Sequence, residues 1–323
     1  MQSAPMQSAP KQSAPSTVLL GVGLKLTATF FFSLMLALGK AYSEYPVAQL
    51  VFFRSFFALA PLMLWLLLRG DFPRALHTRR LGGHLFRSIA GIGSMFCLFA
   101  SYAMLPLADA TALGYAAPLM IAILAAYFLG ERMTPLRWGA VAMGFLGVLV
   151  MLGEHIGAHD PAAPARSAVG AGLALLGAAL VSVAMVQTRR LTRTEDTGAI
   201  TFYFQTTTTL ASAGLLLLAA LWPGDWPGAA GLGAQAWVAP RAQDWAPLIA
   251  IGLLGGVGQI FMTQGYRFAD ASILAVFDYS SLLFAVAIGY TAFGEAPSAR
   301  VLLGAAIVIA AGLAVALQER RRA

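Results

Sequence analysis

The sequence predicts an all-α membrane protein of ten transmembrane helices, arranged as two inverted five-helix repeats with the N and C termini cytoplasmic. Three observations lead to this fold class: the composition, the placement of the basic residues and an internal repeat. Hydrophobic residues make up 59% of the 323 residues and charged residues only 11%, whereas a soluble domain has about 25% charged residues. This balance, with a mean hydropathy of +0.75, excludes a soluble enzyme and a disordered chain. The single cysteine excludes a disulfide-stabilised scaffold.

Ten segments are apolar and long enough to cross a bilayer as helices, which takes about 20 residues each. They cover residues 17–39, 47–68, 84–105, 108–129, 135–152, 169–188, 199–222, 245–265, 271–293 and 301–317. A repeated Gln-Ser-Ala-Pro motif in residues 1–16 predicts a disordered N-terminal tail. Residues 155–168 are expected to form a connecting loop, and residues 319–323 a basic C-terminal tail.

The basic residues predict the orientation. With ten spans both termini lie on one side, and the loops of that side hold 14 of the 21 Lys and Arg residues. The loops of the other side hold four, and the remaining three, Lys25, Arg54 and Arg87, fall within spans. Because cytoplasmic loops are enriched in Lys and Arg, we expect both termini in the cytoplasm.

An internal repeat divides the chain into halves of five helices, residues 17–154 and 169–318. Equivalent residues lie 164 positions apart at Tyr102/Tyr266, Tyr115/Tyr279 and Gly130-Glu131/Gly294-Glu295. A second block matches at 151 positions, where Phe53-Arg54 lies over Phe204-Gln205. Five is an odd number, so the halves have opposite orientations in the membrane. Inverted repeats of this kind are typical of secondary transporters, which bind substrate at the repeat interface.

The stretch from Ala108 to Pro118, followed by Leu129-Gly130-Glu131-Arg132, resembles the fourth helix of the drug/metabolite transporter superfamily, EamA-like. Asp278 to Ala285 with Gly294-Glu295 resembles the matching ninth helix, and Phe53-Arg54 the start of the second. The resemblance covers about residues 17–318. It implies a ten-helix carrier, because members export amino acids, aromatic ones included, or carry S-adenosylmethionine, riboflavin or nucleotide sugars.

Charges inside a span are costly, roughly 2.5–3.5 kcal/mol each at the bilayer centre, so each suggests a function. Arg54 is predicted either to bind a substrate carboxylate or to clamp helices together. Asp278, the only acid well inside a span, is predicted to receive a substrate ammonium group or to carry a coupling proton. The alternative is an internal ion pair with Lys25. Lys25 is itself expected to extend to the cytoplasmic interface, and Arg87 to serve only the topology.

Uncharged polar residues complete the predicted substrate site. Its further members supply amide groups or repeated aromatic rings: Gln205, Gln259, Gln264, Tyr102, Tyr115, Tyr266 and Tyr279. Aromatic walls with few polar groups suit a metabolite with a flat or apolar body, although packing between helices is the other explanation for each Tyr. Pro118 lies inside the fourth segment near Tyr115, and we predict that it is a gating hinge.

The sequence contains no catalytic constellation, no metal-ligand motif and no P-loop. We therefore expect no enzyme activity and no cofactor or metal. The predicted function is a secondary transporter of the bacterial inner membrane that exports small metabolites by alternating access, with amino acids as favoured cargo. Alternatives are a carrier for S-adenosylmethionine, riboflavin or a nucleotide sugar, and, in another class, a lipid flippase or a membrane-embedded enzyme. The expected partners are the metabolite and the lipid bilayer, with no nucleic acid, in a monomer or homodimer.

Overall fold

The computed structural model describes residues 15–73, 76–129, 134–156, 164–191, 194–221, 236–268 and 277–320. Within these residues all regular secondary structure is helical. The first half contains α1 (Pro15–Ala41), α2 (Val47–Leu68), α3 (Leu81–Met104), α4 (Leu107–Gly114), α5 (Ala116–Leu129) and α6 (Pro135–Ile156). The second contains α7 (Pro164–Leu191), α8 (Thr197–Leu221), α10 (Trp245–Phe268), the 3-10 helix η2 (Phe277–Tyr279), α12 (Ser280–Phe293) and α13 (Ala299–Arg320).

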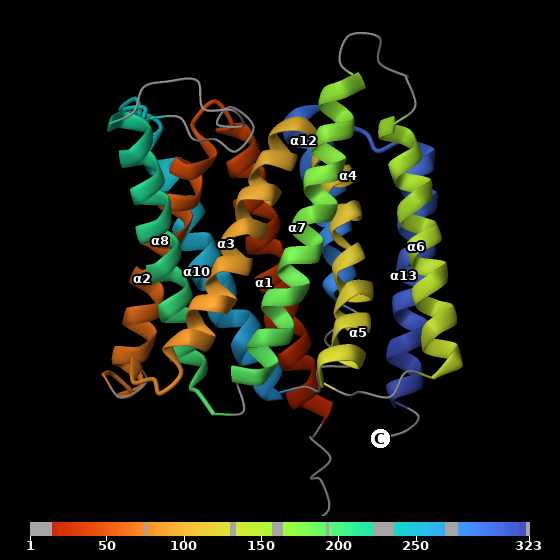
Figure 1. The fold of residues 1–323 in the computed structure, drawn as a ribbon, viewed down its shortest axis with the longest axis horizontal. Coiled ribbons are helices and arrows are strands. Elements are labelled where there is room, and N and C mark those ends of the chain that lie inside the picture. The colour runs from red at the N-terminus through yellow and green to blue at the C-terminus, as the bar shows by residue number, and fades with distance from the viewer. Residues whose placement is uncertain are drawn as a thin grey trace, which may run out of the picture.

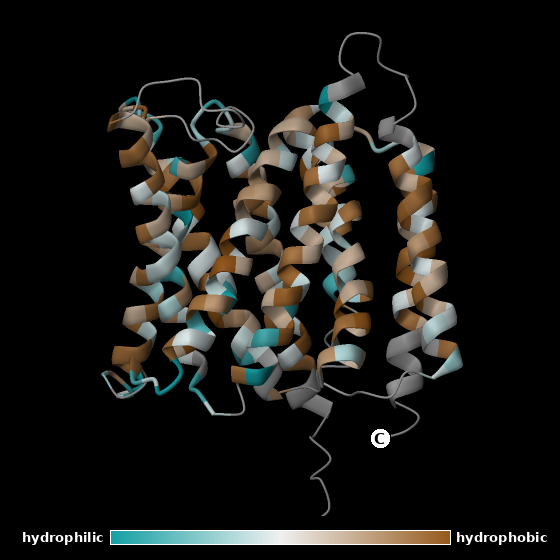
Figure 2. Cartoon of the chain, viewed as in Figure 1, coloured by the Kyte–Doolittle hydropathy of each residue, from teal (hydrophilic) through white to brown (hydrophobic). Residues whose placement is uncertain are grey.

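The helices have the length and hydropathy of membrane spans. In the described part of the chain, seven helical stretches are long and apolar enough to cross a bilayer, one of them formed by α4 and α5 together (Leu107–Phe128). Three shorter apolar stretches lie at Trp138–Gly153, Phe277–Phe293 and Ala299–Ala314. Figure 2 shows the hydrophobic residues along the helices and many of the hydrophilic ones toward the two ends of the bundle. The predicted all-α membrane class is thereby confirmed for the described residues.

Proline marks several helix starts. Pro46 and Pro106 directly precede α2 and α4, and Pro135 and Pro164 are the first residues of α6 and α7. A helix has no internal partner for its first backbone N–H groups, so proline is tolerated there.

The two halves pack reciprocally. The most extensive packing joins α1 and α2 to α10, α3 to α7 and α6 to α13, and α2 also packs against α8. Each pair joins a helix of the first half to one of the second. In Figure 1, α2 and α8 lie at one edge of the bundle and α6 and α13 at the other, while α1 begins and α13 ends at the same lower end.

The fourth predicted segment is broken, which the sequence analysis did not anticipate. It forms two helices, α4 and α5, with Tyr115 between them at φ −68° and ψ −3°. Pro118 explains the break, because it has no N–H to donate to the carbonyl of Gly114 and its ring crowds that carbonyl. The ninth predicted segment begins in the described residues with η2, and its residues 271–276 lie outside them.

The Gly-Glu ending of the ninth segment has a structural explanation. Gly294 ends α12 with φ +67°, a left-handed conformation that glycine adopts without strain. The next residue, Glu295, accepts a hydrogen bond from the Leu107 N–H at 2.9 Å and pairs with Lys40 at 2.7 Å. The carboxylate therefore joins the end of α12 to the start of α4 and to the end of α1. The equivalent Gly130-Glu131 lies outside the described residues.

Glycine residues allow α6 and α13 to pack with their backbones in close contact. A Cβ built on Gly147 of α6 would lie 2.7 Å from the Gly304 carbonyl oxygen of α13, and one on Gly304 would lie 2.5 Å from the Gly147 oxygen. Only glycine permits backbones to approach this closely, which is a common basis of helix packing in membranes.

Candidate functional site

The structure separates the predicted site residues into two groups on either side of α1. Tyr102, Tyr115 and Tyr279 belong to a group formed by α3, α4, η2 and α12. Arg54, Gln205 and Gln259 belong to a second group on α2, α8 and α10. Met35 of α1 packs in the hydrophobic cluster of the second group and Ala37 in that of the first. The single substrate site predicted from the sequence is therefore two separate groups of residues in the structure.

The aromatic group surrounds a cavity of about 180 Å³. The lining comes from α1, α3, α4 and α12: Phe32, Ser33, Leu36, Tyr102, Leu107, Thr111, Gly114, Tyr115, Ser281 and Ala285. Two of the predicted tyrosines are thus wall residues. The cavity lies where α1 and α4 of the first half meet α12 of the second, and its walls are mainly apolar with a few hydroxyl groups.

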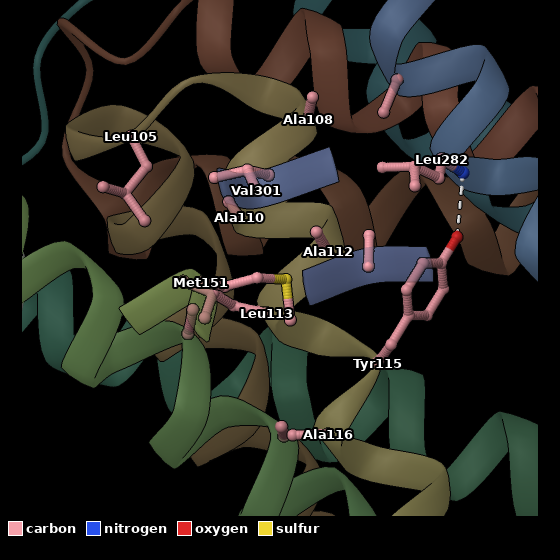
Figure 3. Close-up of a cluster of buried hydrophobic side chains, with 14 of the residues drawn as sticks. Leu105, Ala108, Ala110, Ala112, Leu113, Tyr115, Ala116, Met151, Leu282 and Val301 are labelled. Atoms are coloured by element: carbon pink, nitrogen blue, oxygen red, sulfur yellow. Dashed lines mark hydrogen bonds between the residues drawn. The ribbon is translucent and has the colours of Figure 1, made fainter. Parts of the chain in front are cut away.

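Tyr115 is the centre of the polar contacts beside this cavity. Its hydroxyl accepts a hydrogen bond from the Leu282 N–H at 2.9 Å, as Figure 3 shows, and lies 2.7 Å from the Ser281 hydroxyl. Its ring meets the ring of Tyr279 edge to face, with centroids 5.2 Å apart. The Tyr102 hydroxyl lies 3.1 Å from that of Thr111. The repeat-related pair Tyr115/Tyr279 is therefore in direct contact.

A tightly packed core holds α4 in place. Ala110, Ala112 and Leu113 are fully buried, and Met151 of α6 and Val301 of α13 pack in the same cluster (Figure 3). The small side chains bring α4 close to its neighbours, so Tyr115 at the end of α4 has a fixed position.

Asp278 forms an ion pair with Lys25, with Nζ and Oδ1 2.5 Å apart. Lys25 is only 1% exposed, so the expectation that it extends to the interface is wrong. The side chain of Asp278 is 49% exposed. The carboxylate neutralises an otherwise buried ammonium group, which explains how α1 tolerates a lysine. The internal pair considered from the sequence is the arrangement observed.

Arg54 and Gln205, which occupy equivalent positions in the two halves, bond to each other. The Arg54 Nη1 donates to the Gln205 Oε1 at 2.8 Å, where α2 crosses α8. Gln205 and Gln259 also line a small cavity of about 10 Å³ between α2, α8 and α10. Such a volume accommodates about one water molecule.

Arg87 lies deeper than the sequence analysis assigned it. Its Nε donates to the Thr188 hydroxyl at 3.0 Å, and its guanidinium carbon lies 4.1 Å from the ring centre of Phe204. The guanidinium carbon of Arg54 lies 6.0 Å from the same ring centre. The sequence feature that indicates this depth is the position of Arg87 in the second turn of α3, inside the third apolar segment.

The other candidates lie apart from these groups. Gln264 lies in α10, and the side chain of Tyr266 is outside the described residues. Pro118 is exposed in the first turn of α5, directly after the break. Among the described residues there is no group of three or more His, Cys, Asp or Glu that would hold a metal ion.

Polar contacts join the halves at both ends of the bundle. In the upper clasp, the Tyr45 hydroxyl donates to Asp244 Oδ2 at 2.6 Å, which ties the α1–α2 turn to the start of α10. In the lower clasp, His84 Nε2 lies 3.4 Å from Glu195 Oε2, which ties the start of α3 to the α7–α8 connection. The Arg79 N–H also donates to Glu195. Each clasp therefore joins a residue of the first half to a residue of the second, one at each end of the bundle.

Hydrogen bonds lower the pKa of Glu195 from its ordinary 4.5; the largest effect comes from the Thr78 side chain, with further effects from His84 and the Arg79 N–H. At the other end, the hydrogen bond to Asp244 raises the pKa of Tyr45 above its ordinary 10.0. Glu195 therefore stays ionised well below neutral pH, and Tyr45 stays protonated well above it.

Comparison with known proteins identifies the family. The EamA-like transporter family matches residues 19–153 and again residues 168–317. The chain is 31% identical over 302 residues to the pseudopaline exporter CntI of Pseudomonas aeruginosa, covering 93% of this chain and 97% of the exporter. It is 32% identical over 275 residues to a riboflavin transporter of Brucella anthropi, with 85% and 89% covered.

More distant similarities agree. An S-adenosylmethionine uptake transporter of Rickettsia prowazekii is 25% identical over 275 residues, which are 84% of each chain. A protein of known crystal structure, 23% identical, shares the fold with a TM-score of 0.63 over 96% of this chain and 99% of its own. The relatives named here are transporters from bacteria. The chain belongs to the EamA-like family of the drug/metabolite transporter superfamily, and it is a multi-pass membrane transporter, not an enzyme.

Proposed function

We propose that this protein is a secondary transporter that exports small metabolites across the bacterial inner membrane by alternating access, with amino acids, aromatic ones included, as its cargo. The cavity of about 180 Å³ carries this proposal. It lies between helices of the two halves, and Phe32, Tyr102 and Tyr115 line it. Apolar walls with few polar groups suit a cargo with a flat or apolar side chain.

The proposal includes ten spans in two inverted repeats with cytoplasmic termini. Several observations support it: the reciprocal packing of the halves, and the contacts Arg54–Gln205 and Tyr115–Tyr279 between equivalent positions. Contacts of this kind are expected close to a pseudo-two-fold axis in the membrane plane. The excess of basic residues on the side of the termini supports the orientation.

In this proposal Asp278 links cargo binding to movement. Its carboxylate neutralises Lys25 at present. A cargo ammonium group or a proton that takes over the carboxylate leaves Lys25 buried without that counter-charge, which is costly. Binding would therefore favour a conformation in which Lys25 reaches water. The two conformations would then differ in their affinity for the cargo or the proton, as a transport cycle requires.

The test is counterflow of radiolabelled amino acids into proteoliposomes at two pH gradients, with wild-type protein beside Asp278→Asn. We expect saturable uptake of aromatic amino acids that depends on the gradient, and loss of that dependence in the variant. Unchanged dependence in Asp278→Asn would contradict proton coupling through Asp278. Absence of uptake for every amino acid would contradict the cargo class.

Riboflavin and S-adenosylmethionine are the second candidates for the cargo. Relatives at 32% and 25% identity are transporters of these compounds. Each has a flat ring system, which the same aromatic walls would suit. The vesicles used for amino acids are therefore tested next with these two solutes.

A further inference from the structure

Buried polar atoms without hydrogen-bond partners concentrate on α2, α3 and α8. Among the described residues they include Arg54 Nε, Arg87 Nη1, and the hydroxyls of Ser88 and Thr206. Buried polar groups in native proteins are nearly always satisfied, so a concentration of unsatisfied ones calls for an explanation. A ligand that binds these atoms is one explanation that accounts for all of them together.

The two arginines approach the same place from different helices. Arg54 comes from α2 and Arg87 from α3, and both guanidinium carbons lie within 6.0 Å of the ring centre of Phe204 in α8. Arg54 is only 8% exposed. Each guanidinium has one anchoring neutral partner, Gln205 for Arg54 and Thr188 for Arg87. These anchors fix the direction of the remaining N–H groups.

No acidic residue of the described chain forms an ion pair with either arginine. By contrast, the buried Lys25 and the partly buried Lys40 each pair with a carboxylate. The cation–π contacts with Phe204 compensate only part of the cost of removing the two guanidinium groups from water. The region between α2, α3 and α8 therefore holds two positive charges that no acidic residue of the described segments neutralises.

We propose that Arg54 and Arg87 form an anion site for a cargo with two carboxylates, one for each guanidinium; this rests on the proposed transport function. The planar guanidinium fork matches the geometry of a carboxylate. The hydroxyls of Ser88 and Thr206 are additional donors on the same helices. A cargo of this charge neutralises the site while bound, so the loaded carrier no longer carries two unneutralised guanidinium groups through the membrane.

The site is closed in this conformation. The adjoining cavity, which Gln205 lines, has about 10 Å³. Arg87 lies one turn beyond His84 on α3, and His84 belongs to the lower clasp. Opening of the lower clasp is therefore the route by which the dicarboxylate reaches the arginines, and it connects this site to the end of the bundle where the chain termini lie.

The experiment measures thermal stabilisation of the full chain in nanodiscs of zwitterionic lipid at constant ionic strength. The probes are succinate and L-glutamate, with L-glutamine as the isosteric control that lacks the second carboxylate, and inorganic phosphate as the other oxyanion. We expect saturable stabilisation by succinate and glutamate. Glutamine should bind roughly tenfold more weakly than glutamate, or weaker still, because one charge-assisted pair is lost. Arg54→Gln and Arg87→Gln should each raise the half-saturating concentration by a similar factor.

Arg69→Gln is the matched control, because Arg69 is a half-exposed arginine beyond the end of α2, and it should leave binding unchanged. Equal stabilisation by glutamate and glutamine, a response to phosphate alone, or equal behaviour of all three Gln variants would overturn the proposal. If a Gln variant does not fold, Arg54→Lys and Arg87→Lys keep the charge and should retain part of the response; full loss in both would also contradict it.

The same preparations separate this inference from the proposed function. Saturable counterflow of aromatic amino acids without any response to dicarboxylates leaves the transport proposal standing and removes the anion site. Stabilisation by dicarboxylates that depends on both arginines, without aromatic counterflow, supports the anion site and removes the aromatic cargo.

Discussion

At the scale of single residues, Tyr115 shows how one hydroxyl joins the two halves. It accepts a hydrogen bond from the Leu282 N–H in the first turn of α12 and lies close to the Ser281 hydroxyl. Backbone N–H groups in the first turn of a helix have no partner within the helix. The side chain at the end of α4 therefore caps a helix of the other half.

Tyr115→Phe should destabilise the protein by about 1–3 kcal/mol, because it leaves buried polar groups unsatisfied while keeping the ring contact with Tyr279. The measurement is the free energy of unfolding or the Tm in detergent. Tyr127→Phe is the matched control, since Tyr127 is 82% exposed, and it should have little effect. Equal effects of the two substitutions would contradict the capping role.

At the scale of elements, the break between α4 and α5 is the feature that Pro118 imposes on an otherwise apolar run. A substitution by alanine restores an N–H that can bond to the carbonyl of Gly114, and alanine has the highest helix propensity. The two helices would then tend to merge into one straight helix, and the bend at Tyr115 would be lost.

We therefore expect Pro118→Ala to lower the transport rate several-fold while the protein stays folded. Initial rates of counterflow in proteoliposomes check this, with gel filtration to verify folding. Pro135→Ala is the control, because Pro135 occupies the first position of α6, where proline interrupts no helical bond. Transport at the wild-type rate in Pro118→Ala would rule out the hinge.

At the scale of the whole molecule, the two clasps differ chemically. The upper clasp joins the neutral Tyr45 to Asp244, whereas the lower one joins the carboxylate of Glu195 to His84. Because the pKa of Glu195 is lowered in the folded protein, its ionisation stabilises the closed lower end above the ordinary glutamate pKa. That stabilisation is lost as the pH falls through the lowered pKa.

We predict that the Tm decreases as the pH is lowered from 6 to below 4.5, and that Glu195→Gln makes this decrease smaller. The protection factors for hydrogen exchange at the start of α3, which correct for the pH dependence of intrinsic exchange, should fall over the same pH range in the wild type and less in Glu195→Gln. Glu44→Gln is the control, because Glu44 is an exposed residue in the α1–α2 turn with its carboxylate 3.6 Å from Arg241. A pH profile that Glu195→Gln leaves unaltered would show that the lower clasp does not depend on this carboxylate.

Much of the fold was predictable because bilayer thickness and backbone hydrogen bonding restrict a chain of this composition to long apolar helices. The site was predictable only in part. The spacing of Tyr115 and Tyr279 identified them as equivalent residues of the two halves, and the structure brings their rings into contact. The division of the candidates by α1 and the partnership of Arg87 with Phe204 depend on how helices rotate and cross. The hydropathy of a single sequence does not reveal the rotation and crossing of its helices.

Reciprocal packing also has a consequence for how the protein is made. Translation delivers α1 to α6 before any of α7 to α13 exists, yet α1 and α2 pack mainly against α10, α3 against α7 and α6 against α13. The newly inserted first half has no way to complete its own core. Its helices therefore remain loosely associated in the lipid until the second half has been synthesised and inserted. Assembly is therefore a late event that follows insertion of most of the chain, and neither half is an independent building block.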